Sequence, residues 1–392
     1  MTQICHTVFF LVLLLIIPPV TSAAQSPVYH KCGFDHTEIW NDLIFSDIEQ
    51  PQYFSSFQNR SSLTVPVVFH IVLTDHHARI SDEMILRQLN FHNQDFQGSN
   101  PDGIKVPDRF KKLAGRSSIR FCLAAEDPYD RPALSIIRVN TSIDQIGIKE
   151  ELYFTVKGGS DAWDTERYLN IWIADTGSHL AGLGSAPGQR DANKDGVVIH
   201  PGLFNQEEPC RTLTHEVGHY LGLFHMWNQD GSCEDNDFIE DTPVQAYPYY
   251  DCPQEERTTC GSPDMFMNFM DYTHRDCMFF FTPGQISRME KILSMHRSQL
   301  IFTKTECNPE KNVSDFILYP NPVSDGSVTF RFQNDDLVYL HIQIYSVSGK
   351  LIYALHRWKQ KQLKLDLPSL RSGLYIIAVN GVAKKLCFSW EI

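Results

Sequence analysis

The chain has 392 residues, of which 42% are hydrophobic and ten are cysteines, and its formal net charge is −13. This length is sufficient for more than one folded domain, and the acidic balance argues against a nucleic-acid-binding protein, which needs a basic face. Ten cysteines are many for a cytosolic enzyme and favour an oxidising compartment.

The first segment has the layout of a secretory signal peptide. An apolar run from Val8 to Ile17 is followed by small residues up to Ala24, although no Lys or Arg precedes the run. The alternative, a membrane anchor, needs a longer apolar run. We therefore expect residues 1–24 to be a signal peptide, the protein to be secreted or placed at the cell surface, and the mature chain to have no stable membrane span.

Residues 25–60 show weak periodicity and are interpreted as a pro-segment, with Cys32 in its only dense cluster. A folded domain begins at the β-branched run 63–73, which is typical of a buried strand. Ser81 is expected to cap the helix that follows. Further strands are predicted at 119–124, 168–174 and 197–200.

The eleven residues 215–225 carry a metal-binding pattern. His215 and His219 are four residues apart, so on a helix predicted over 211–223 their imidazoles lie on the same face. Gly222 can end that helix in a backbone conformation closed to other residues, which brings His225 back as a third ligand. Three imidazoles with one open position are the ligand set of a catalytic zinc ion. The alternative, surface histidines on an amphipathic helix, does not require this spacing.

Glu216 lies between the first two histidines, within reach of a water molecule at the open position. The pattern thus predicts a hydrolase in which zinc activates the water and Glu216 acts as general base. A group of hard oxygen ligands follows the third histidine and suits calcium, with a solvated acidic loop as the alternative. The candidate calcium ligands are Asp235, Asp237, Glu240, Asp241 and Thr242.

The rest of the chain divides into a last helix and a β-rich segment. Thr282 begins a predicted helix over 283–301 with an apolar stripe. After Cys307 short alternating segments are separated by turns, which is typical of a small β-sandwich. We expect this domain to cover residues 306–392.

The segment Asn268-Phe269-Met270-Asp271-Tyr272, together with the zinc motif, resembles the pappalysin family (M43) of metzincin metalloproteases. The resemblance extends upstream through Val67–His70 and Leu169–Trp172, and downstream through Cys277, Gly284 and Arg288. It implies an α+β, zincin-like catalytic domain over residues 61–305, with a mixed twisted sheet and zinc on the active-site helix. It also implies that Met270 lies beneath the metal; from the sequence alone, core packing is an equal alternative.

The same resemblance implies further roles. Tyr272 would stabilise the oxyanion, or only pack. The disulfides would be Cys233–Cys260 and Cys252–Cys277, whereas spacing alone leaves three connectivities open for these four residues. Cys32 would keep the zymogen inactive as a cysteine switch, with a disulfide to Cys122, Cys210, Cys307 or Cys387 as the alternative.

One position departs from the arginine-preferring members of the family. They carry an acidic residue in the S1′ pocket where this chain has Arg275. A positive charge would repel a basic P1′ side chain, so we predict that cleavage before Arg or Lys is not favoured.

The segments Leu318–Pro322 and Leu370–Tyr375 resemble C-terminal sorting domains of the type IX secretion system. This implies an all-β, Ig-like sandwich that engages the secretion machinery; a generic binding module is the alternative. We therefore interpret the chain as a secreted monomeric zinc endopeptidase acting on protein or peptide substrates. A binding or adhesion protein on a protease scaffold and another zinc hydrolase, such as an amidase, are the competing interpretations.

Overall fold

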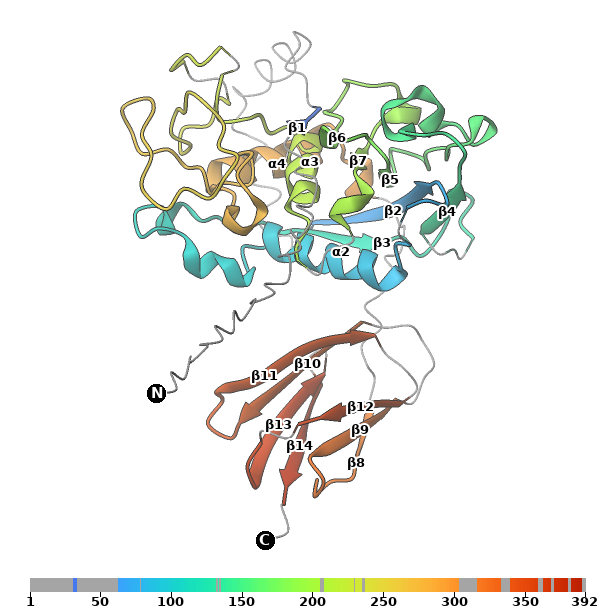
Figure 1. Ribbon diagram of the computed structural model, residues 1–392, viewed down its shortest axis with the longest axis vertical. Coiled ribbons are helices and arrows are strands. Elements are labelled where there is room, and N and C mark those ends of the chain that lie inside the picture. Colours follow the sequence, from blue (N-terminus) through green and yellow to red (C-terminus); the bar gives the residue numbers. More distant parts are fainter. Residues whose placement is uncertain are drawn as a thin grey trace, which may run out of the picture.

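A computed structural model describes residues 31–33 and 63–389, with gaps at 78, 132, 134, 205–207, 229, 235–236, 303–315, 333–338, 359–361, 368–369 and 380–381. The expected signal peptide, most of the expected pro-segment, Asp235 and Cys307 lie outside the described residues. The described chain forms a part with a mixed sheet and helices, followed by an all-β part (Figure 1). Among the helices described, none combines the length and apolar character needed to cross a bilayer.

A seven-stranded sheet forms the centre of the first part. Its strands are β1 (Lys31–Cys32), β2 (Leu63–Leu73), β3 (Ile119–Leu123), β4 (Ile136–Asn140), β5 (Leu169–Ala174), β6 (Leu180–Gly184) and β7 (Val197–Ile199). Central β2 pairs in parallel with β3, β4 and β5, and β5 pairs in parallel with β7. Next to β7 lies antiparallel β6, on whose other side the short β1 pairs in parallel. The strands predicted as β2, β3, β5 and β7 are confirmed, whereas β1, β4 and β6 were not predicted.

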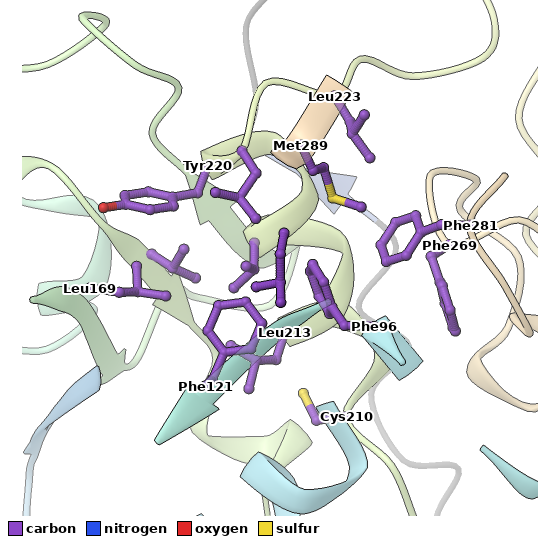
Figure 2. Packing of buried hydrophobic residues seen from close by; sticks show 14 of the residues in the cluster. Phe96, Phe121, Leu169, Cys210, Leu213, Tyr220, Leu223, Phe269, Phe281 and Met289 are labelled. Carbon is purple, nitrogen blue, oxygen red and sulfur yellow. The ribbon is translucent and has the colours of Figure 1, made fainter. Parts of the chain in front are cut away.

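The strand β2 is buried on both faces. Val65, Val67 and Phe69 belong to the largest hydrophobic cluster, whereas Val68 and Val72 belong to smaller clusters. This follows from the period-two alternation of side chains along a strand, and it explains the unbroken apolar sequence of the segment. Figure 2 shows part of the largest cluster, in which Phe96, Phe121 and Leu213 pack together.

Among the described residues, four α-helices accompany the sheet: α2 (Asp82–Phe96), α3 (Arg211–Tyr220), α4 (Pro283–Met295) and α5 (Gln299–Phe302). Ser81 caps α2 as predicted, since its side chain accepts a hydrogen bond from the Met84 N–H at 3.2 Å. The prediction of a single helix over 283–301 is wrong in one respect, because the helix is interrupted between α4 and α5. At this break the buried Arg297 guanidinium binds the Asp195 carboxylate at 2.6 Å.

The described residues of the second part form seven strands in two sheets. They are β8 (Phe316–Tyr319), β9 (Ser327–Phe332), β10 (Tyr339–Ser346), β11 (Leu351–Trp358), β12 (Gln362–Asp366), β13 (Gly373–Val379) and β14 (Val382–Phe388). One sheet has the order β11-β10-β13-β14 and the other β12-β9-β8. Side chains of both sheets share one hydrophobic cluster, including Phe330, Ile342 and Ile377. The predicted all-β character is confirmed.

Candidate active site

The helix α3 is held at its N-terminus by side chains of α2. Cys210, at the N-cap position, offers no side-chain cap; instead its N–H donates to the Gln88 side chain at 2.7 Å. Arg211, which is 2% exposed, forms ion pairs with Asp95 and, at 2.8 Å, with Asp102. Thr214 also donates to Asp95 at 2.8 Å. Gln88 and Asp95 lie seven residues apart, hence on one face of α2, so a polar stripe fixes the first turn of α3.

Three imidazoles converge at the other end of this helix. The helix ends at Tyr220, earlier than predicted, and Gly222 follows with a φ of 84°. The Leu223 N–H then bonds the Gly218 carbonyl at 2.9 Å, which closes the turn in the way that left-handed glycine caps do. As a result the Nε2 atom of His219 lies 3.0 Å from those of His215 and His225, which are 3.3 Å from each other.

This arrangement fits a zinc ion. The Nδ1 atoms of His215 and His219 face the carbonyls of Phe269 and Leu223 at 2.7 and 2.8 Å, so Nδ1 carries the proton and Nε2 presents a lone pair. Lone pairs this close repel one another unless a cation lies between them. Tetrahedral zinc ligands at about 2.0–2.1 Å from the metal are about 3.3 Å apart. Burial also lowers the pKa of His215 to about 4, which keeps its imidazole neutral and able to ligate.

Glu216 lies on the same helix and faces β6. A Cβ atom on Gly182 would come within 2.8 Å of the Glu216 Cγ atom, and one on Gly184 within 2.2 Å of the Glu216 carbonyl oxygen. Only glycine therefore lets the strand approach the helix this closely. The carboxyl group is fully buried, and burial raises its pKa to about 8, against the opposing effect of a hydrogen bond from Cys32.

Cys32 lies at the imidazole group. Its Sγ atom and a nitrogen of each histidine all lie within 4.8 Å of one another, and in the part of the chain described no other three His, Cys, Asp or Glu residues bring their ligand atoms this close together. The Cys32 thiol donates to Glu216 Oε2 at 3.2 Å, and its carbonyl accepts from the Tyr272 hydroxyl at 3.5 Å. Cys32 keeps its thiol, as do Cys210 and Cys387.

Met270 and Tyr272 lie beside the histidines. Met270 is fully buried, and its Sδ atom would be 2.6 Å from a Cβ atom on Gly218 of α3. The ring of Tyr272 is 4.9 Å from that of His225 and 5.7 Å from that of His215. Burial raises the pKa of the Tyr272 phenol, so its hydroxyl keeps its proton and can donate a hydrogen bond.

The chain between the third histidine and α4 is irregular and crosslinked. The structure contains the disulfides Cys233–Cys260 and Cys252–Cys277. Cys122 is also disulfide-bonded.

The acidic group after the third histidine is only in part available to a cation. The Asp237 carboxylate accepts from the Thr242 hydroxyl at 2.8 Å and from the Ile239 N–H at 3.1 Å. Asp241 accepts from the Gly284 N–H at 2.8 Å through Oδ2, whereas its buried Oδ1 has no hydrogen-bond partner. Glu240 is exposed.

Arg275 begins a short 3₁₀ turn, Arg275–Cys277, between the tyrosine and α4. Its side chain is 29% exposed, and its buried Nε atom makes no hydrogen bond but lies 3.7 Å from the Asp276 carboxylate. Burial raises the pKa of the Cys210 thiol, at the start of α3, to about 12, and the positive charge of Arg275 opposes this rise.

Comparisons with known proteins agree with this geometry. The peptidase M43 family model, described as pregnancy-associated plasma protein-A, matches residues 156–294. An extracellular metalloprotease of Arthroderma gypseum is 31% identical over 292 residues, which cover 70% of this chain and 88% of that protein. The chain belongs to the M43 family. It is a secreted or cell-surface zinc metalloendopeptidase of the metzincin type.

Solved structures of M43 proteases are similar to this chain. Mature mirolysin of Tannerella forsythia in complex with a cleaved peptide is 38% identical, with a TM-score of 0.59, covering 62% of this chain and 97% of that chain. A promirolysin variant of the same organism is 35% identical, with a TM-score of 0.59, covering 69% and 96%. A secretion system C-terminal sorting domain model matches residues 317–387, within the all-β part.

Several residues of this M43 site were not predicted from the sequence. The glycines of β6 gave no strand signal, because glycine is depleted in strands. Trp227 stacks on His225 with ring centroids 4.4 Å apart and an interplanar angle of 14°. Its position two residues after the third histidine is the sequence feature that would indicate a place for Trp227 in the site.

Proposed function

We propose that His215, His219 and His225 hold the catalytic zinc ion and that Glu216 is the general base of peptide-bond hydrolysis. The observation that carries this proposal is the convergence of three Nε2 atoms, two of them in a fixed tautomer, next to a buried carboxyl group. Zinc, when bound, supplies Lewis-acid chemistry and a nucleophile at neutral pH. The side chains described below move protons and orient the substrate.

The charge of a bound zinc ion would favour the ionised form of the buried Glu216 carboxyl. As a carboxylate, Glu216 would take the proton of the attacking water and then deliver it to the amine leaving group. Tyr272 donates its hydroxyl hydrogen to the developing oxyanion, because burial keeps the phenol protonated. An extended substrate pairs with the edge of β6, the strand that lies against Glu216. The buried Met270 packs under α3 and supports the imidazoles from below.

We also propose that Cys32 keeps the unprocessed protein inactive. Its position among the three imidazoles and its bond to Glu216 support this role, because both would block the base and the open ligand position. In the Cys32→Ala variant, the unprocessed protein should hydrolyse peptides at a rate close to that of the processed enzyme. Unchanged inactivity of that variant would contradict the switch.

For substrate choice, we propose that Arg275 disfavours a basic P1′ residue. Its partly exposed guanidinium carries a positive charge and has a buried Nε atom that makes no hydrogen bond, only a 3.7 Å ion pair with Asp276, so an acidic or uncharged side chain is the better occupant. In a peptide library the wild type should select against Arg and Lys at P1′, and Arg275→Asp should reverse this selection. A wild-type profile dominated by basic P1′ residues would refute the proposal.

The remaining proposals concern calcium and domain organisation. We propose that calcium binds at the acidic group through Asp241, whose orphaned Oδ1 atom supports this role. The two sheets around one core support an Ig-like sandwich over 306–392 that engages the type IX secretion machinery. They follow a catalytic domain over 61–305, a pro-segment over 25–60 and a signal peptide over 1–24.

The decisive experiment compares Glu216→Gln with the wild type in the processed protein. Loss of the general base should lower kcat for peptide cleavage by about 10²–10⁴-fold, while the zinc content measured by metal analysis stays at one ion per chain. Glu255→Gln, at an exposed position, is the matched control and should retain full activity. Equal activity of Glu216→Gln and the wild type would overturn the assignment of the base.

A further inference from the structure

An apolar patch lies beneath the pro-segment next to the imidazole group. Ala186 and Phe224 form a buried cluster of their own, and Cys32 packs against it. Ala186 follows the end of β6, and Phe224 immediately precedes the third histidine. The patch is therefore built from the two segments that border the catalytic groups.

Phe238 extends this patch. Its ring is 6.3 Å from that of Phe224 in an edge-to-face arrangement, and it is 40% exposed. Its φ of 56° is unusual for a bulky residue, so the surrounding fold must hold it in place. Arg288 does so, because it donates to the backbone carbonyls of Asp237 and Phe238 while its guanidinium lies 6.0 Å from the centre of the Phe224 ring. An aromatic side chain is thus kept partly in solvent beside a buried one.

The patch lies next to the catalytic groups, and the segment that contains Cys32 covers it. Cys32 binds Glu216, and the next residue, Gly33, donates to the Gly182 carbonyl of β6 at 2.9 Å. Loss of the segment that contains Cys32 uncovers both the edge of β6 and the apolar patch. A substrate that takes the place of this segment meets the two together.

We propose that Ala186, Phe224 and Phe238 form a substrate subsite that accepts an apolar side chain on the N-terminal side of the scissile bond. This inference rests on the proposed function and names part of its substrate class. The side follows from strand direction. β1 pairs with β6 in parallel, but over two residues only, and antiparallel pairing is the more stable arrangement for a longer added strand. Ala186 lies beyond the C-terminal end of β6, past the position of Glu216. The residues that precede the scissile bond in an antiparallel peptide therefore lie over the patch.

The test uses the full chain after removal of the pro-segment, with peptides that differ at one position on the N-terminal side of the cleaved bond. A peptide with Leu or Phe at the preferred position should have a kcat/KM roughly tenfold above that of the Gly peptide, the size expected for an apolar side chain entering an apolar site. In Phe238→Ala this ratio should fall to within about threefold of unity. Tyr129→Ala, which removes an aromatic residue that is 77% exposed at a distant position, is the matched control and should keep the wild-type ratio.

Two results would overturn the subsite: equal rates for Leu and Gly peptides at every N-terminal position, or an unchanged ratio in Phe238→Ala. A binding assay separates its failure from that of the proposed function. In the Glu216→Gln variant, fluorescence anisotropy should give a Kd for the labelled Leu peptide roughly tenfold below that for the Gly peptide. Selective binding without cleavage by the wild type would refute the hydrolytic assignment and keep the subsite, whereas cleavage without selectivity would do the reverse.

Discussion

His215, Glu216 and His219 stand on one regular helix, whereas His225 and Tyr272 stand on irregular chain. The helix is anchored by the side chains of α2 and by close contact with β6. The irregular part, from Leu223 to the start of α4, contains two disulfides instead. The two halves of the site thus reach one geometry by different means, so each half can be weakened separately.

Asp271 is the polar centre of the irregular half. Its carboxylate accepts hydrogen bonds from the N–H groups of Tyr249 and Tyr272 at 2.9 and 2.6 Å, and from the Gln245 side chain at 2.7 Å. It plays the part that Asp95 plays at the start of α3. In each half a buried carboxylate holds the chain next to a residue of the site. Asp271 binds backbone N–H groups and a neutral amide, whereas Asp95 binds the Thr214 hydroxyl and the charged Arg211 guanidinium.

The largest effect is expected when the anchor of the helix is removed. Asp95→Ala leaves the buried Arg211 with Asp102 as its remaining ion-pair partner, so the free energy of unfolding should fall by about 3–5 kcal/mol. Denaturant unfolding measures this change. Asp82→Ala on the same helix removes an exposed ion pair with Arg138 and should cost no more than about 1 kcal/mol. Equal effects of the two substitutions would show that the polar stripe does not anchor α3.

The irregular half should respond next most strongly, to loss of a crosslink. Replacing Cys252 and Cys277 together by Ser opens a loop with a sequence separation of 25 residues, which should lower stability by about 3 kcal/mol. Thermal unfolding measures the loss, and Cys387→Ser, which removes a thiol outside any disulfide, is the control. If the double variant unfolds at the wild-type temperature, the disulfide does not hold this half together.

Acidification should destabilise the sheet on which the regular half rests. His70 in β2 is fully buried between Ser160 and Asn170, and burial lowers its pKa from 6.5 to about 4. The unfolded chain therefore takes up the proton first, so this stability is complete above pH 6.5 and is lost as the pH falls toward 4. Between pH 6.5 and 5 the wild type should lose about 2 kcal/mol more than His70→Gln in denaturant unfolding. A parallel pH dependence of the two proteins would contradict this, and His179→Gln, at an exposed position, should follow the wild type.

The regular half was also the more predictable one. The four-residue spacing of His215 and His219 and the apolar run of β2 predict helix and strand through side-chain periodicity, and both are found. Positions in the irregular half depend on contacts between residues far apart in the chain, such as Asp271 with Gln245, which periodicity does not encode. The strand β6 was not predicted because it contains glycines, which are depleted in strands. These glycines are needed for the close approach of α3, so the packing of the site and the strand propensity of the sequence make opposite demands at these positions.

The smallest effect is expected at Gly182, one of these glycines. In Gly182→Ala the new Cβ atom would lie 2.8 Å from the Glu216 Cγ atom and 3.0 Å from the backbone oxygen of Val198. Because the side chain of the base is the softer of the two neighbours, it should shift, and kcat should fall roughly tenfold while zinc content is unchanged. Gly103→Ala, whose Cβ atom would meet only the Asn100 side chain at 4.0 Å, is the matched control. A change confined to KM would mean that Gly182 serves the pairing of the substrate with β6 rather than the position of Glu216.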